Sequence, residues 1–541
     1  MAGKQAKSWL GKPVVLAAVI LFALVANGLF WAVRFPAWFP NDEQQHYLYA
    51  THYDGVAPID SDTGPGQVPS DLVAYVELVD FGPHRTTQRL INPSELRPDK
   101  MQSLQEQADD PALASVYVDD IEPQDMAIVG HPDFEAYHPP LYFMSLGQVL
   151  RISHDAGLGL RWRLLVGRAF SVLLGLLAVG FAVWMARVFW PGQWALPWLV
   201  GLMTGMQVLV AFYTSALNNE VLAYVLFSAF MALGAVAIVR KPSVWVIGAM
   251  VLVGLLAGAT KITMVIMLPM GLIALVLCRS PRWVKVCSGW AVALMFASAL
   301  LWLLIPLGGG ESLKDSYDSG GNTVRSFPAE MFSRGRLWEH GQMLRWYWGL
   351  QIGSAGWADA WMPYKLHYFW SALTIASLVI GGFMLRGLDP QRRKMMLWLL
   401  TGPALMALLL YAIDYRFASM IGGFFTVRAQ YYIPVAAVQM LWMVWGLVGC
   451  FKASKRVWVA SGLAAMLMAF NLFTLHRVLS PRYYGEISWW QQCERIADLW
   501  PLSAGFVAVL DVLALVTAGL AVPALFLAFK NAETKGGVDL G

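Results

Sequence analysis

The stretch that decides the fold is residues 13–33, PVVLAAVILFALVANGLFWAV, in which 21 consecutive residues carry no charge. A transmembrane helix needs about 20 predominantly apolar residues to cross the roughly 30 Å hydrocarbon core of a bilayer. Three lysines precede this stretch and no small-residue cleavage site follows it, so we interpret it as an uncleaved first membrane helix. The basic flank predicts a cytoplasmic N-terminus.

The composition of the whole chain is that of a membrane protein. Of its 541 residues, 57% are hydrophobic and 14% are charged, whereas soluble domains carry roughly 25% charged residues. This deficit excludes a soluble enzyme, a disordered protein and a coiled coil. The net charge of +4 is too small to indicate a nucleic-acid partner. The four cysteines lack the spacing of a metal site.

Eleven further apolar runs follow the first one, and they predict an all-α polytopic membrane protein with about 12 transmembrane helices. The eleven runs lie near 164–187, 194–213, 221–239, 243–259, 262–278, 284–307, 367–386, 395–413, 431–450, 457–475 and 504–529.

One more apolar run, 139–153, is too short to span, because as a helix it would extend only about 22 Å. The short basic turns of the chain alternate between the two sides of the membrane only if this run stays on one side. We therefore predict an interfacial helix at 139–153. Two amphipathic helices are predicted upstream of it, at 71–79 and 94–110.

These runs divide the chain into five segments. Residues 1–33 hold the first helix, and 34–163 form a large outer loop that carries the interfacial helices. Transmembrane helices 2–7 occupy 164–307, and a glycine-containing, mobile outer loop occupies 308–366. Helices 8–12 and a cytoplasmic tail occupy 367–541. Because basic turns are typical of the cytoplasmic side, we place both termini there and the large loops outside.

The most informative polar stretch begins at Asp42 and Glu43, about nine residues after the first apolar run. A carboxylate at the lipid–water boundary can have a raised pKa and act as a general base, so both are candidate catalytic residues. On a helix, His46 would share a face with Asp42. The alternative is a helix start, at which Asp42 is the cap and Glu43 favours the helix dipole.

Other polar side chains lie where the apolar runs end on the predicted outer side. His138 and Tyr142 flank the Pro-Pro pair that opens the interfacial helix, and Asn219 and Glu220 occupy a very short turn. Ionisable groups at a membrane helix end indicate a site, although helix capping would also explain them. Lys261 lies on the outer side against the positive-inside trend, so it either snorkels or needs an anion, such as Glu220 or a lipid phosphate.

A late polar stretch contains Arg428, Gln430 and Tyr431 at the outer start of an apolar run. Arg428 could bind a phosphate through two hydrogen bonds. Asp511 lies inside the last run, where it could pair with a polar group of another helix. Three more arginines add positive charge on the outer side, namely Arg161, Arg163 and Arg168.

In their order along the chain, these motifs resemble those of the GT-C superfamily, which are polytopic glycosyltransferases that use polyprenyl-phosphate-linked sugars. The motifs are the early Asp-Glu with His, the His-Pro-Pro-Leu-Tyr helix start, the Asn-Asn-acid turn and the Lys-x-Thr turn. The similarity is strongest to a bacterial group of uncharacterised predicted membrane sugar transferases. That group carries Gln-Gly-Arg-Tyr-x-x-Pro where this chain reads RAQYYIP at 428–434, and Asn-Asn-Asp where it reads NNE at 218–220.

The resemblance implies an inverting glycosyltransferase of the bacterial inner membrane, with its active site facing the periplasm. Asp42 would act as general base on an acceptor hydroxyl of a glycan, lipid or protein, with Glu43 close behind. Some members of the superfamily use a divalent metal, so Mg²⁺ or Mn²⁺ could lie between Asp42 and Glu220. The substrate-binding residues, with the first three as candidates for the donor phosphate, would be Lys261, His138, Arg428, His46, Tyr142, Asn219, Glu220, Gln430 and Tyr431.

This interpretation makes a geometric prediction. Asp42, His138, Glu220 and Lys261 should converge in one cavity at the outer membrane face, with Asp42 within about 20 Å of Lys261, since a donor phosphate and sugar would lie between them. Two alternatives remain: a polysaccharide polymerase or ligase that consumes a polyprenyl-linked glycan, and a lipid or sugar transporter. A transporter would have inverted repeats and helices broken at mid-depth, and no repeat is evident in the sequence.

Overall fold

The computed structural model describes eleven stretches of the chain: residues 12–35, 43–56, 68–78, 98–115, 117–118, 138–240, 242–304, 354–355, 360–361, 364–421 and 429–533. Asp42, Arg428 and most of the predicted loop 308–366 lie outside these residues. The described elements are helices, apart from two antiparallel pairs of two-residue strands. The pairs are β1 (Val68–Pro69) with β2 (Tyr117–Val118), and β3 (Ser354–Ala355) with β4 (Ala360–Trp361).

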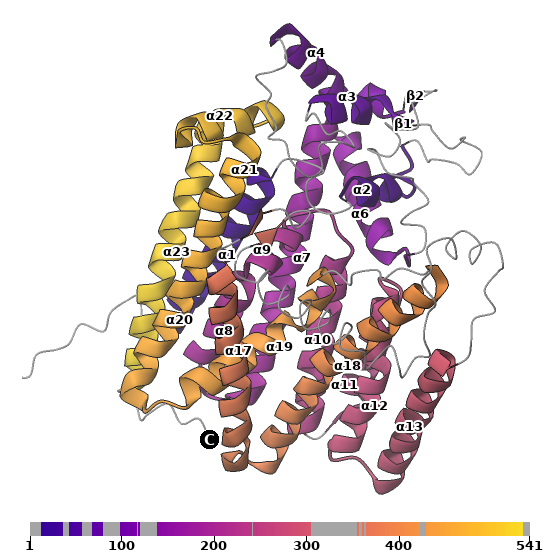
Figure 1. Cartoon of the computed structure of the whole chain (residues 1–541), viewed down its shortest axis with the longest axis vertical. Coiled ribbons are helices and arrows are strands. Elements are labelled where there is room, and N and C mark those ends of the chain that lie inside the picture. The colour runs from indigo at the N-terminus through magenta and orange to yellow at the C-terminus, as the bar shows by residue number, and fades with distance from the viewer. Residues whose placement is uncertain are drawn as a thin grey trace, which may run out of the picture.

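Long apolar helices form the body of the molecule (Figure 1). A helix satisfies its backbone hydrogen bonds within the segment, which is the requirement for a segment that crosses hydrocarbon, and Pro403 and Pro523 interrupt this pattern inside two of these helices. The long helices are α1 (Pro13–Arg34), α7 (Leu160–Phe189), α10 (Glu220–Val239), α13 (Arg282–Leu304), α17 (Tyr364–Met384), α18 (Pro390–Ile421), α20 (Ala453–Phe473) and α23 (Ala504–Glu533).

Shorter helical pieces complete this body, and several of them continue one another. They are α8 (Ala195–Gly205), α9 (Val208–Thr214), α11 (Val244–Gly258), α12 (Met267–Leu277) and α19 (Ala436–Met443), with the 3₁₀ turns η5 (Ile262–Ile266), η7 (Leu385–Gly387) and η8 (Ala429–Val435) and the π-helical turns η9 (Val444–Val448) and η10 (Thr474–Leu479).

All twelve predicted apolar runs coincide with helices, but the prediction of about 12 spans is only partly supported. Among the described residues, eight helices are long and apolar enough to cross a membrane, or nine if the bent pair α8–α9 is one span. The difference arises at α11, α12 and α13. Helix α11 has 15 residues and α12 has 11, so hydrophobicity alone overestimated their reach.

The bent pair α8–α9 turns by 67° between Gly205 and Val208. Such a break frees backbone groups that a membrane helix must satisfy elsewhere. Asn471 of α20 does this, because its side-chain nitrogen donates to the carbonyl of Met206 at 3.0 Å while its oxygen accepts from the Trp31 indole at 2.9 Å. The break is therefore held by a polar residue from a neighbouring helix.

The helices of the large first loop gather at one end of the bundle, together with α22, and the chain leaves α23 near the opposite end (Figure 1). Helices α3 and α4 occupy the two stretches predicted to be amphipathic, and α6 occupies the short apolar run. The helices at this end are α2 (Glu43–Thr51), α3 (Ser70–Leu78), α4 (Pro98–Asp109), η3 (Pro111–Ser115), α6 (Leu141–Asp155), α21 (Ser480–Tyr484) and α22 (Trp489–Leu499).

Helix α10 lies in the middle of the packing, against α7, α11 and α18. Gly234 allows the close approach of α18, since a Cβ at this position would lie 2.1 Å from the Trp398 ring. The first and last long helices, α1 and α23, also pack together. Their contact includes the fully buried Asp511, which forms an ion pair with Arg34. Asp511 thus has the polar helix partner that the sequence suggested.

Candidate functional site

Three arginines on the first turns of α7 each pair with a carboxylate of the first loop. The sequence indicated that they add positive charge on the outer side, and the structure shows that this charge is compensated. Each guanidinium is buried and is neutralised by its carboxylate partner, so these pairs fix α4, α3 and α2 to the bundle. The pairs are Arg161–Asp109, Arg163–Asp71 and Arg168–Glu43.

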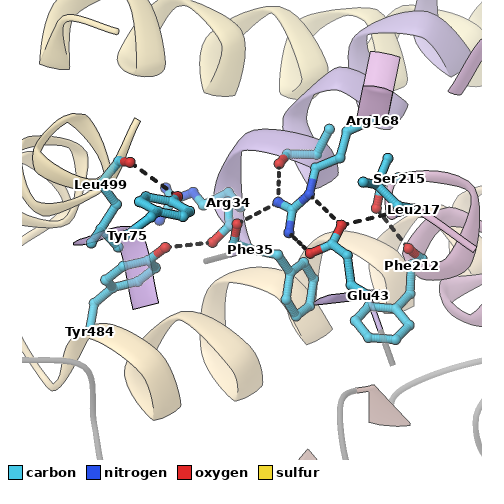
Figure 2. Close-up of polar contacts among 11 residues, drawn as sticks. Arg34, Phe35, Glu43, Tyr75, Arg168, Phe212, Ser215, Leu217, Tyr484 and Leu499 are labelled. Atoms are coloured by element: carbon cyan, nitrogen blue, oxygen red, sulfur yellow. Dashed lines mark hydrogen bonds and ion pairs between the residues drawn. The ribbon is translucent and has the colours of Figure 1, made fainter. Parts of the chain in front are cut away.

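The pair at α2 is the most completely bonded of the three (Figure 2). The Nε and Nη2 atoms of Arg168 donate to the two oxygens of Glu43 at 2.8 and 2.6 Å. The remaining Nη1 donates to the carbonyls of Ala32 and Phe35, at the end of α1. Glu43 also accepts from the backbone N–H of Leu217 at 3.0 Å. This node joins α1, α2, α7 and the turn that leads into α10.

The turn before α10 carries the second buried ion pair, between Glu220 and Lys261. The two side chains are 1% and 3% exposed and bond through Oε1 and Nζ. The ammonium also lies 4.6 Å from the centre of the Tyr431 ring, a cation–π contact. Of the two anions that the sequence offered to Lys261, a carboxylate or a lipid phosphate, the structure shows the carboxylate.

In the turn before α10, Asn218, Asn219 and Glu220 have buried polar side-chain atoms without a hydrogen-bond partner among the described residues. Asn218 accepts from the backbone N–H of Glu220 through Oδ1 at 2.8 Å. Its Nδ2, the Nδ2 of Asn219 and the Oε2 of Glu220 are buried and have no hydrogen-bond partner among the described residues. Most buried polar groups have a partner, so three such atoms within three residues indicate that a ligand or water binds here.

The start of α6 contacts two turns: the turn at 218–220 before α10, and the turn that holds Lys261. The backbone N–H of Leu141 donates to the carbonyl of Ala259 at 3.0 Å, and the Tyr142 hydroxyl accepts from the backbone N–H of Asn218 at 2.9 Å. The Pro-Pro pair restricts the backbone at this entry. The start of α6 therefore holds the Asn-Asn turn and the lysine turn together, although they are about 40 residues apart.

Two histidines lie in the same neighbourhood. Burial lowers the pKa of His46 well below its usual range, and the nearby His138 and Lys261 lower it further. Burial and then the charge of Lys261 lower the pKa of His138 to about 4. Both imidazoles are therefore neutral at physiological pH and can donate or accept hydrogen bonds without adding charge.

The late motif reaches this region from η8. The side-chain oxygen of Gln430 accepts from the Tyr213 hydroxyl at 2.7 Å, and Tyr431 lies beneath the Lys261 ammonium. Glu220 and Lys261 thus meet as predicted, and His138 lies close enough to Lys261 for its charge to act on the imidazole. Tyr142, Asn219 and Tyr431 adjoin them, and the cavity that these residues were predicted to share stays a prediction. The predicted separation of Asp42 from Lys261 stays untested, because Asp42, like Arg428, lies outside the described residues.

Sequence reasoning missed two residues that organise the site. Asn218 was noted only as part of its motif, yet it contacts both Tyr142 and Glu220. Arg168 was noted only as one of three arginines that add positive charge on the outer side, yet it holds Glu43 and the end of α1. The available signal was its position, since a charge within an apolar run needs a partner.

An apolar cavity of about 580 Å³ lies beside the lysine turn, between α11 and the η5–α12 segment. Every residue that lines it is apolar or glycine. The lining includes Gly258 and Ile262, which flank Lys261 in the chain, and extends along the helices to Ile247 and Leu275. Two of the lining side chains, Leu255 and Ile262, are more than 60% exposed, so the cavity is an open groove.

The expected metal site between Asp42 and Glu220 stays untested, because Asp42 lies outside the described residues. No group of three or more His, Cys, Asp or Glu side chains in this part of the chain could hold a metal ion. Glu220, one of the two expected ligands, bonds an ammonium that would compete with a cation. We therefore derive no step through Mg²⁺ or Mn²⁺.

Comparison with solved structures gives two crystal structures of ArnT from Cupriavidus metallidurans, one bound to undecaprenyl phosphate and one in the apo state. Both have a TM-score of 0.33, with 16% and 14% sequence identity. The matches cover 74% of this chain and 68% and 67% of the ArnT chains. No curated protein matches the sequence. The family described as "Predicted membrane protein (DUF2142)" matches residues 25–438, which is most of the chain, and the protein therefore belongs to this family of membrane proteins.

Proposed function

We propose that this protein is a GT-C-type membrane glycosyltransferase that moves a sugar from a polyprenyl-phosphate donor to an acceptor hydroxyl at the outer membrane face. The observation that carries the proposal is the juxtaposition of an open apolar groove with a buried lysine. The groove begins at the turn that holds Lys261. A lipid-linked phosphate has this combination of a long apolar chain and an anionic head.

The lengths of the helices favour a lipid substrate over a soluble one. Helix α11 has 15 residues and therefore extends about 22 Å, less than the roughly 30 Å of hydrocarbon. If α11 starts at the cytoplasmic boundary, its far end and Lys261 lie below the outer surface of the bilayer. A substrate that diffuses within the membrane would reach this position sideways, through the groove.

The polar groups around Lys261 suit the departure of a phosphate. A developing phosphate charge is stabilised best by fixed donors in a site that excludes water. Lys261, which pairs with Glu220 in the structure, supplies a positive charge when a phosphate replaces that carboxylate, and two buried asparagine amides and two neutral histidines supply further hydrogen bonds. The acceptor is a glycan, lipid or protein hydroxyl. Consumption of a whole polyprenyl-linked glycan by a polymerase or ligase would use the same groups.

A transporter is the second candidate, and the break between α8 and α9 is the observation that favours it. Broken helices line substrate sites in many transporters, and the side chain of Gln207 at this break is fully buried, with both polar atoms unpartnered among the described residues. However, Asn471 already satisfies the Met206 carbonyl. The cavity beside the break is only about 20 Å³, which is room for about one water.

The experiment is to reconstitute the purified protein in liposomes with synthetic polyprenyl-phosphate sugars and to follow release of polyprenyl phosphate. Release that depends on an added acceptor supports the transferase. Movement of the intact donor between leaflets without release would favour the transporter instead.

The lysine makes the first specific prediction. Lys261→Met should weaken binding of a synthetic polyprenyl phosphate by roughly 10–100-fold, because a charged hydrogen bond contributes about 1.5–3 kcal/mol. Lys455→Met, exposed in the first turn of α20, should leave binding unchanged. If loss of Lys261 destabilises the protein, the Lys261→Met/Glu220→Gln variant removes the uncompensated carboxylate. Unchanged binding in folded variants would contradict the phosphate role.

Orientation is the second prediction. We propose that α4 lies outside and that both termini and the basic turn before α20 are cytoplasmic. After replacement of the native cysteines, Ser103→Cys, exposed on α4, should react with an impermeant maleimide in intact cells. Ser454→Cys, exposed in the first turn of α20 beside the basic turn, should react only after permeabilisation. The reverse pattern would invert the topology and place the site inside.

A further inference from the structure

We propose that Glu220 is the proton acceptor of the transfer and that the donor phosphate activates it by drawing Lys261 away. This inference rests on the proposed function and names the residue that performs its chemistry. The sequence pointed instead to Asp42 and Glu43.

Glu43 and Glu220, the two candidate carboxylates that the structure describes, differ in their hydrogen bonding. Both oxygens of Glu43 accept from Arg168, and one also accepts from the Leu217 amide. Arginine is not deprotonated in proteins, so this carboxylate stays in a permanent ion pair. Glu220 bonds only through Oε1, and its partner is the lysine. Its Oε2 is buried and has no partner among the residues that the structure describes.

The lysine can exchange one anion for another. Lysine carries a compact charge on a flexible stem, and Lys261 is both the partner of Glu220 and the neighbour in sequence of Ile262, which lines the groove. A phosphate arriving at the end of the groove competes with Glu220 for the ammonium. When the ammonium moves, the carboxylate loses its counter-charge in a dry environment, which makes it a stronger base.

The surrounding turn keeps Glu220 in place while the lysine moves. Asn218 holds the backbone N–H of Glu220 through Oδ1 and is itself held by Tyr142. The two free Nδ2 groups, of Asn218 and Asn219, remain as donors. They are suited to an oxygen of the acceptor or of the sugar. The acceptor hydroxyl would then lie against Oε2.

The transfer step follows from these positions. The acceptor oxygen attacks the anomeric carbon from the side opposite the phosphate, and the new C–O bond forms as the anomeric carbon–phosphate oxygen bond breaks. The bonding pair leaves on the phosphate, beside Lys261. The hydroxyl proton passes to Oε2 of Glu220. The configuration inverts, and the proton reaches solvent when the product leaves and Lys261 returns.

Glu220→Gln is the test, since glutamine can still accept from Lys261 but cannot take a proton. We expect turnover to fall by roughly 10²–10⁴-fold, while polyprenyl phosphate binds at least as tightly as to the native protein. The acidic limb of the native pH–rate profile should disappear. Glu220→Asp, which keeps a carboxylate, should restore part of the turnover together with an acidic limb, and it serves as the test if the glutamine variant does not fold.

The outcomes separate the two proposals. If the native protein releases no polyprenyl phosphate from any donor, the transferase and this inference both fail. If the native protein is active and Glu220→Gln keeps more than half of its turnover, the transferase stands and the inference is wrong. Loss of donor binding without loss of turnover at saturating donor would likewise overturn it and leave Glu220 a binding residue. Asp42→Asn, compared in the same assay, shows whether that carboxylate takes the proton instead.

Discussion

Arg168→Met is expected to lower the free energy of unfolding by about 3–5 kcal/mol, the usual effect of removing one partner of a buried ion pair. The guanidinium and the Glu43 carboxylate are both fully buried. Methionine fills a similar volume but leaves the carboxylate without a counter-charge. It also removes the donors to Ala32 and Phe35 at the end of α1. Unfolding in mixed detergent micelles, followed by tryptophan fluorescence, would measure the change.

The exposed pair Arg151–Asp155 provides the matched control. Its side chains are 56% and 64% exposed and its atoms are 3.8 Å apart, so Arg151→Met should change stability by less than about 1 kcal/mol. The double variant Arg168→Met/Glu43→Leu removes both buried charges and should recover much of the loss. An Arg168→Met variant as stable as Arg151→Met would show that the node does not hold α2 and the α10 turn.

The helices themselves were predictable because a long apolar stretch has few stable alternatives in a membrane. The run 13–33 differs from α1 by a single residue, and 221–239 from α10 likewise. What the sequence could not give is how far each helix reaches. The runs 243–259 and 262–278 look like two full spans, yet the helices there are short and meet at the turn that holds Lys261. Contacts of this turn with α6 and with Glu220 hold it in place.

The sequence identified charged residues that belong to the candidate site, but it did not determine which of them form ion pairs with one another. A charge at a membrane helix end requires a partner, so Glu220 and Lys261 were identified without a structure. The choice of partner depends on the fold, because Arg168 and Glu43 are separated by 125 positions. The same limit explains why the arginines of α7 were counted as added positive charge on the outer side. Charge composition shows that positive groups are present but does not show which of them are neutralised.

Asp511→Asn is expected to lower the free energy of unfolding by a similar amount, about 3–5 kcal/mol. The carboxylate is fully buried within α23 and accepts from Arg34 of α1 and from the Trp489 indole at 2.7 Å. Asparagine keeps the shape and one oxygen but removes the negative charge, so the Arg34 guanidinium would remain buried with only neutral partners, Ser480 and Gln492.

The position of this pair makes a second consequence of Asp511→Asn measurable. Arg34 ends α1, and the Tyr484 hydroxyl donates to its carbonyl at 2.7 Å, so the pair joins the first helix to the last one and to the helices between α20 and α23. Loss of the charge should increase proteolysis and amide exchange around α21 and α22 before the rest of the bundle opens, because local opening requires less free energy than global unfolding. Asp155→Asn, at the exposed pair, should change neither measurement. If Asp511→Asn unfolds like Asp155→Asn, with unchanged exchange at α22, then the packing of α1 against α23 stabilises this side of the molecule without the ion pair.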